Sequence, residues 1–247
     1  MKTNGNTIFI PGATSGIGLA LAVRLQEAGN TVIIGGRRQH LLDEIAAAHP
    51  GIEGVAIDTA DAASIASVSA SVISRFPETN VLIAMAGIMR PENVLTPEFL
   101  DTAEATIVTN LLGPIRLVAA FTEHLQSKPD ASIITVSSGL AFVPLPATPT
   151  YSATKAAIHS LSISLRTRFA ATSVEVLELA PPAVQTDLMG QADNPEYLPL
   201  DAFVDEVMEL LASPSESGEI LVERVKPLRF AEVNGSFDQV LAHLAAR

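Results

Sequence analysis

The chain has 247 residues, no cysteine and a formal net charge of -12. The lack of cysteine excludes disulfide bonds and thiol catalysis, and the negative charge argues against nucleic acid and anionic membranes as partners. Since the length suits one α/β unit with a sizeable core and no linker interrupts it, residues 1–247 are expected to form a single domain.

Apolar strand candidates alternate with helical patterns along the chain. The predicted strands span residues 6–10, 31–35, 54–58, 80–84, 131–136, 174–180 and 219–223. Runs such as Val32 to Ile34 are apolar throughout, which is typical of parallel strands covered on both faces. This order predicts a doubly wound, Rossmann-type parallel sheet of about seven strands with helices on both faces, and a ligand site at the carboxyl ends of the strands.

A glycine-rich segment follows the first predicted strand. It has the spacing GxxxGxG and leads into a helical stretch that begins at Leu19. Glycines let the backbone turn tightly and approach a pyrophosphate, whose negative charge is stabilised by the amide groups of a helix N-terminus. The segment therefore predicts a dinucleotide site that includes Gly12, Thr14, Ser15, Gly16, Ile17 and Gly18.

The end of the second predicted strand indicates which dinucleotide is bound. An acidic residue there would bind the ribose diol of NAD, but this chain has Gly36, followed by Arg37 and Arg38. Guanidinium groups pair with phosphate oxygens, so the two arginines favour NADP(H), with NAD(H) still possible. The alternative is that these arginines cap a strand or are simply solvated.

Tyr151 and Lys155 lie four residues apart in a stretch of helical composition, with Ser138 thirteen residues before Tyr151. Side chains four apart share one face of a helix. A nearby ammonium stabilises the phenolate, so we expect the pKa of Tyr151 to lie below that of a free phenol. Tyr151 is therefore a candidate general acid or base.

These motifs together resemble the short-chain dehydrogenase/reductase family, from about Thr7 to the C-terminus. Gly12, Gly16 and Gly18 match the family's cofactor loop, and its four catalytic positions are matched in order and spacing by Asn110, Ser138, Tyr151 and Lys155. The resemblance implies hydride transfer between a nicotinamide and a carbonyl or carbinol carbon.

The resemblance also implies a role for each of the four residues. Tyr151 would transfer the proton to or from the substrate oxygen, and Ser138 would hydrogen-bond that oxygen, with Ser137 as a fallback. Lys155 would lower the pKa of Tyr151 and bind the nicotinamide ribose. Asn110 would hold a water that connects Lys155 to solvent.

Further cofactor contacts follow from the same resemblance. They are Asp58 at the adenine, Tyr151 and Lys155 at the nicotinamide ribose, Val184 and Thr186 at the carboxamide, and the segment after the fourth strand, Ala86 and Gly87. Residues 187–200 would form a substrate lid. The expected pocket residues are Phe142, Met89, Met189 and Tyr197.

Three departures from the family pattern concern the cofactor region. Pro11 replaces a threonine, Ala84-Met85 replaces two asparagines, and Pro182 replaces a glycine. In the family, the threonine and the asparagine segment are linked by hydrogen bonds. Losing both together therefore leaves no buried polar group without its partner. We expect altered cofactor affinity before any loss of chemistry.

The sequence thus predicts a cytoplasmic, NADP(H)-dependent oxidoreductase that interconverts an alcohol and a ketone or aldehyde. It is expected to act on a small to medium apolar substrate and to form a homodimer or homotetramer through residues 97–126 and 150–171. Its five histidines are scattered without partners at ligand spacing, so no metal site is expected. The alternatives are a catalytically degenerate dinucleotide-binding sensor or scaffold and, within the enzymes, a dehydratase, epimerase or ketoacyl reductase that acts on a carrier-linked substrate.

Overall fold

A computed structural model describes residues 1–190, 192–213 and 216–246 of the chain. All strands are parallel and lie in one sheet, in the order β3-β2-β1-β4-β5-β6-β7. They are β1 (Thr7–Pro11), β2 (Thr31–Gly36), β3 (Ile52–Ala56), β4 (Thr79–Ala84), β5 (Ala131–Val136), β6 (Val174–Leu179) and β7 (Glu219–Ile220). The predicted doubly wound sheet is confirmed, although the last strand is shorter than predicted.

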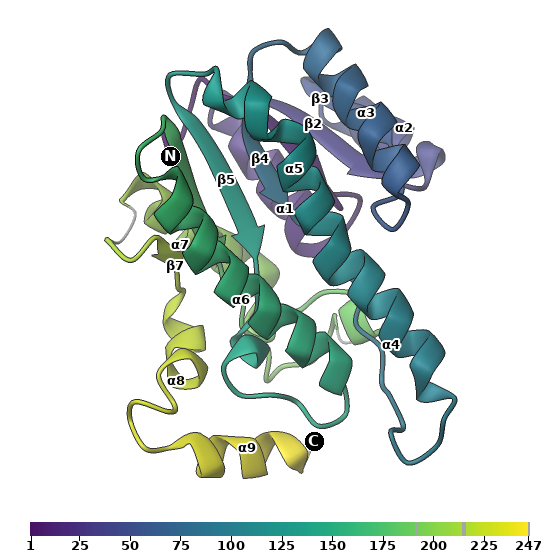
Figure 1. Cartoon of the computed structure of the whole chain (residues 1–247), viewed down its shortest axis with the longest axis vertical. Helices are drawn as coiled ribbons and strands as arrows, with labels where there is room; N and C mark the ends of the chain where they lie inside the picture. The colour runs from purple at the N-terminus through teal and green to yellow at the C-terminus, as the bar shows by residue number, and fades with distance from the viewer. Residues whose placement is uncertain (191, 214–215, 247) are drawn as a thin grey trace.

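Helices cover both faces of the sheet (Figure 1). They are α1 (Gly16–Glu27), α2 (Gln39–Ala48), α3 (Ala62–Arg75), α4 (Phe99–Ile107), α5 (Gly113–Gln126), α6 (Pro149–Phe169), α7 (Leu200–Ala212), α8 (Lys226–Arg229) and α9 (Phe237–Ala245). Successive side chains of a strand point to opposite faces. In β1, Ile8 and Ile10 therefore pack with α1, α2 and α7, whereas Phe9 packs with α3 and α5. This is why the strands are apolar throughout.

The long helical region predicted for residues 97–126 is interrupted by a π-helical turn, η1 (Val108–Leu112), between α4 and α5. By length and composition alone, the run Phe99–Gln126 could cross a membrane. In the fold, the inner face of α5 is fully buried against the sheet through Leu117, Phe121 and Leu125. The run therefore packs as a core helix does.

The strand order reverses between β1 and β4, and the segments that follow these two strands touch each other. Gly12 has a φ of +96°, and a Cβ at this position would lie 2.5 Å from the Cα and N of Ala86. Only glycine allows this approach, because other residues rarely adopt such a φ and would collide with backbone. In doubly wound sheets, ligands bind at this switch point.

We expect Gly12→Ala to lower the free energy of unfolding by about 2–4 kcal/mol, through an unfavourable φ and the collision with Ala86. Gly235 is a matched control, because its φ is +69° but an added Cβ would have nothing within 4 Å. Gly235→Ala should cost only about 1 kcal/mol. Urea unfolding measures both, and equal losses would contradict the close approach to Ala86.

Candidate active site

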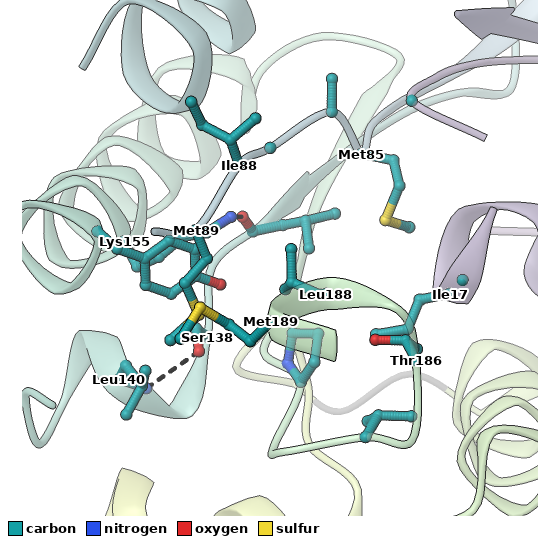
Figure 2. Close-up of a pocket in the computed structure, with 18 of the residues that line it drawn as sticks. Ile17, Met85, Ile88, Met89, Ser138, Leu140, Lys155, Thr186, Leu188 and Met189 are labelled. Carbon is teal, nitrogen blue, oxygen red and sulfur yellow. Dashed lines mark hydrogen bonds between the residues drawn. The ribbon is translucent and has the colours of Figure 1, made fainter. Parts of the chain in front are cut away.

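A cavity of about 1410 Å³ runs along the carboxyl ends of the strands. This volume is larger than the roughly 300–1,000 Å³ of a typical site for one small ligand. The cavity therefore has room for an extended molecule together with a second, smaller molecule. Figure 2 shows Ser138 and Lys155 on one side, Ile17 and Thr186 on the other, and Leu188 between them. The pocket therefore has two ends, one at the glycine-rich turn and one at the start of α6.

The glycine-rich turn lines the first end as predicted. Gly12 and residues 14–18 all contribute to the cavity wall. Helix α1 begins there with no acidic residue in its first turn, and the hydroxyl of its N-cap residue Ser15 makes no capping bond. The amide groups of this helix end are free to bind an anion, as a pyrophosphate site requires.

Gly36, Arg37 and Arg38 extend this end along β2. A side chain at position 36 would lie 2.4 Å from the Cγ2 of Thr14, so the glycine leaves room for the turn and no acidic residue can occupy its place without displacing it. Both arginines are exposed, and neither forms an ion pair with a described residue. Their guanidinium groups are therefore available to a phosphate.

The other predicted cofactor residues also line the cavity. Asp58 lies beside the arginines, with its Oδ1 accepting a hydrogen bond from the Ala60 amide at 2.9 Å. Thr186 packs over the glycine turn, since a Cβ on Gly16 would lie 3.5 Å from its side chain. The remaining members of this set in the wall are Ala86, Gly87 and Val184.

Ser138, Tyr151 and Lys155 meet at the second end of the pocket. Ser138 follows β5, while Tyr151 and Lys155 lie one turn apart near the start of α6, which Pro149 opens at its first helical position. Lys155 Nζ donates to the Val136 carbonyl at 2.8 Å and lies 5.5 Å from the centre of the Tyr151 ring. The predicted hydroxyl, phenol and ammonium are thus brought together.

Burial controls the ionisation of this group. It raises the pKa of Tyr151 to about 12, although the hydrogen bond with Ser138 acts in the opposite direction. Burial also lowers the pKa of Lys155 to about 8. The prediction of a lowered Tyr151 pKa is therefore wrong for the free protein, because the loss of water around the phenolate outweighs the hydrogen bond with Ser138. Tyr151 is a neutral phenol at neutral pH.

Asn110 lies behind the cavity wall in the π-helical turn η1. Its side chain is committed to one backbone segment, since Oδ1 accepts from the Ile88 amide at 2.8 Å and Nδ2 donates to the Ile88 carbonyl at 2.7 Å. A Cβ on the adjacent Gly87 would lie 3.5 Å from Asn110 Oδ1 and 3.8 Å from Lys155 Nζ. Asn110 therefore supports the segment next to Lys155, and its water-binding role stays a prediction.

The substrate side of the pocket differs from the prediction in two respects. Met89, Met189 and Tyr197 line it as expected, but Phe142 does not, because its ring packs edge-on against His159 at 4.8 Å and lies under the Arg229 guanidinium. The outer wall of the pocket was not predicted from the sequence. That wall contains Arg224, Leu228, Gln239, Val240, His243 and Leu244.

The structure accommodates the first two departures from the family pattern. Pairing of β1 with β4 ends at Phe9 and Leu82, so Pro11 lies where this ladder needs no donor. The side chain of Met85 packs near Gly18, where an added Cβ would lie 3.0 Å from its Cγ. Buried side-chain atoms without a partner in the described structure belong to Ser69, Glu92 and Thr148, all outside this segment. The third departure, Pro182, lies in the cavity wall.

One group of possible metal ligands lies beside the pocket, although sequence spacing indicated none. The ligand atoms of His159, Glu178 and Glu219 lie within 4.8 Å of one another. Glu178 accepts hydrogen bonds from Ser137 and His159, and Glu219 accepts two from Arg229, at 2.6 and 3.1 Å. Both carboxylates are thus already bound by protein donors, and we assign no metal to the group.

Comparison with known proteins agrees with this geometry. The family model described as short chain dehydrogenase matches residues 6–196. The uncharacterized oxidoreductase DltE of Bacillus subtilis is 40% identical over 237 residues, covering 94% of this chain and 93% of that protein. A short chain dehydrogenase from Burkholderia cenocepacia, solved in complex with NADP, superposes with a TM-score of 0.83 at 26% identity and covers 99% of both chains.

A second solved structure is an alcohol dehydrogenase from the archaeon Thermococcus sibiricus, complexed with 5-hydroxy-NADP. It superposes with a TM-score of 0.80 at 26% identity, covering 89% of this chain and 97% of that one. The match of the family model and the relative at 40% identity both span most of the chain. The protein therefore belongs to the short-chain dehydrogenase/reductase family and is an oxidoreductase.

Proposed function

We propose that this oxidoreductase uses NADP(H) to interconvert an alcohol and a ketone or aldehyde. One observation carries the proposal: Ser138, Tyr151 and Lys155 meet at one end of a pocket. Its other end has a helix N-terminus and two arginines that form no ion pair with a described residue. That far end fits a pyrophosphate and a 2'-phosphate. The two solved neighbours, which hold NADP and 5-hydroxy-NADP, support the same cofactor.

The bound nicotinamide would supply or accept the hydride, and the protein would handle the proton. A neutral Tyr151 is ready to donate to a carbonyl oxygen, since its pKa in the free protein is about 12. Ser138 would hydrogen-bond the same oxygen as charge develops on it. The Lys155 ammonium would hold the nicotinamide ribose and stabilise the phenolate that remains.

The lining of the second end favours a small to medium apolar substrate. Met89, Leu145, Met189, Val240 and Leu244 all contribute to it. Residues 187–200 would be the substrate lid, in which Met189 has a strained φ of 64° and residue 191 lies outside the described structure. A lid that closes here would exclude water from the reacting carbon.

A sensor or scaffold that binds the dinucleotide without catalysis is the alternative. Such a protein would need the first end of the pocket, where the dinucleotide binds. It would not need the hydroxyl, phenol and ammonium that lie together at the second end. For partners, we propose a homodimer or homotetramer through α4, α5 and α6, whose outer faces expose Ile107, Ile115 and Ile163. A cytoplasmic location is part of the same proposal.

Replacement of the phenol tests the proton transfer. We expect Tyr151→Phe to lower kcat by about 10² to 10⁴, with little change in the Kd for NADPH, because only the transferable proton is lost. Ser164→Ala, on the exposed side of the same helix, is the control. Absorbance of NADPH with a panel of carbonyl compounds measures turnover. Retained activity of Tyr151→Phe contradicts the role, and NADPH binding by the wild type without any turnover supports the sensor.

Charge reversal tests the cofactor choice. We expect Arg37→Asp to raise KM for NADPH at least about tenfold, since it removes a charge-assisted hydrogen bond and adds like-charge repulsion, while KM for NADH changes less than about threefold. Arg75→Asp, an exposed arginine on α3, should change neither value. Equal effects of Arg37→Asp on the two cofactors would remove the basis for NADP(H).

The pKa of Lys155 predicts how cofactor binding depends on pH. Because this pKa is about 8 in the free protein, the ammonium is present below pH 8 and is lost above it. The Kd for NADPH should therefore rise about threefold to tenfold between pH 7 and pH 9. Lys155→Arg keeps its charge and should give a flat profile in the same fluorescence titration. A parallel rise in both proteins would assign the effect to another group.

A further inference from the structure

A buried carboxylate lies directly behind the serine pair at the end of β5. Glu178, the penultimate residue of β6, is fully buried between Leu177 and Leu179. A buried carboxylate without partners would cost several kcal/mol, so its hydrogen bonds constrain the neighbouring elements. Two side chains satisfy it. Ser137 Oγ donates to Oε1 at 2.5 Å, and His159 Nδ1 lies 3.0 and 2.9 Å from its two oxygens.

His159 belongs to the same helical face as Tyr151 and Lys155, which together with Ser138 form the reaction end of the pocket. It follows Lys155 by four residues and Tyr151 by eight, and a spacing of four keeps side chains on one side of a helix. Carboxylate oxygens accept hydrogen bonds, so we assign Nδ1 of the imidazole as the donor. The network Ser137-Glu178-His159 therefore joins β5, β6 and α6.

The hydrogen bonds around Ser137 fix the backbone that leads to Ser138. The Ser137 amide donates to the Leu179 carbonyl at 2.9 Å, and its hydroxyl is held by Glu178. One residue earlier, the Val136 carbonyl accepts from Lys155 at 2.8 Å. The Ser137 hydroxyl is thus occupied by Glu178, and the hydroxyl that hydrogen-bonds Tyr151 is that of Ser138.

We propose that Glu178 and His159 are positioning residues that hold Ser138 and Tyr151 at the distance at which both reach one substrate oxygen. The inference rests on the proposed function, because it assigns a task to residues that would serve Ser138 and Tyr151. These two come from different elements, the end of β5 and the start of α6, and the network ties the two together through β6. A displacement of about 1 Å between reacting groups can cost about 10²-fold in rate.

Contacts outside the network hold the imidazole in place. The ring of Phe142 packs edge-on against His159 at 4.8 Å, and Arg229 lies over Phe142 at 4.7 Å while it binds Glu219. Phe142 directly follows the short 3-10 turn η2 (Gly139–Ala141) that Ser138 caps, with its hydroxyl accepting from the Leu140 amide at 3.1 Å. The segment that carries Ser138 therefore contacts the network at both of its ends.

A pair of serine variants tests the proposal on the holoenzyme with NADPH and a carbonyl substrate. Ser137→Ala removes the link from Glu178 to β5, and we expect kcat to fall about tenfold with unchanged KM for the carbonyl and unchanged Kd for NADPH. Ser162→Ala is the matched control, because Ser162 is also buried and hydrogen-bonds a β5 side chain, Thr135, at 2.6 Å. It should lose a similar amount of stability but less than twofold in kcat.

A conservative variant separates position from charge. Glu178→Gln keeps an acceptor for Ser137 and should retain kcat within about threefold, whereas Glu178→Leu should lose at least as much kcat as Ser137→Ala. Equal kcat in Ser137→Ala and Ser162→Ala overturns the proposal, and so does full activity of Glu178→Leu. Ser138→Ala separates failure of the positioning role from failure of the proposed function. If Ser138→Ala loses turnover while Ser137→Ala does not, only the positioning role is contradicted. If Ser138→Ala keeps turnover, the role of Ser138 in the proposed reaction is contradicted as well.

Discussion

The cost of burying the Lys155 ammonium is the constraint on which the reaction end depends. Among the described residues, the Val136 carbonyl is its hydrogen-bond acceptor, and burial brings its pKa down to about 8. An ammonium has three donors, and Lys155 lines the pocket, so a molecule bound there can accept from it as well. A ligand that brings further oxygen atoms relieves this cost. Ligand binding beside Lys155 and the ionisation of its side chain are therefore linked.

Small side chains define the cofactor end as much as functional groups do. Gly12 lets the segments after β1 and β4 touch, Gly36 leaves space for Thr14, and Gly18 lies against Met85. The exchange of polar residues at positions 11, 84 and 85 for apolar ones leaves no orphaned polar atom in this region of the described structure. Shape and backbone amides, more than side-chain hydrogen bonds, thus form this part of the wall.

The sequence was sufficient for features that depend on local pattern. The strands, the turn at Gly12 and the helical pair at Tyr151 follow from periodicity and spacing within short windows. What failed depends on contacts between distant segments. The pKa of Tyr151 is set by how deeply α6 is buried, Phe142 turns toward His159 instead of the cavity, and Glu178 finds its partners on β5 and α6. A glutamate between two leucines, near the end of an otherwise buried strand, was the available signal for the last of these.

Helix α9 forms part of the outer wall of the pocket but adds no fully buried side chain to the hydrophobic core. It contributes Gln239, Val240, His243 and Leu244 to the cavity, yet none of its residues is fully buried. Substitutions on it remove few packing contacts, so they cost little folding free energy. Mutations that reshape this wall are therefore accessible to selection without compensating changes elsewhere. The shape of the pocket mouth can therefore change while the fold and the glycine-rich turn stay the same.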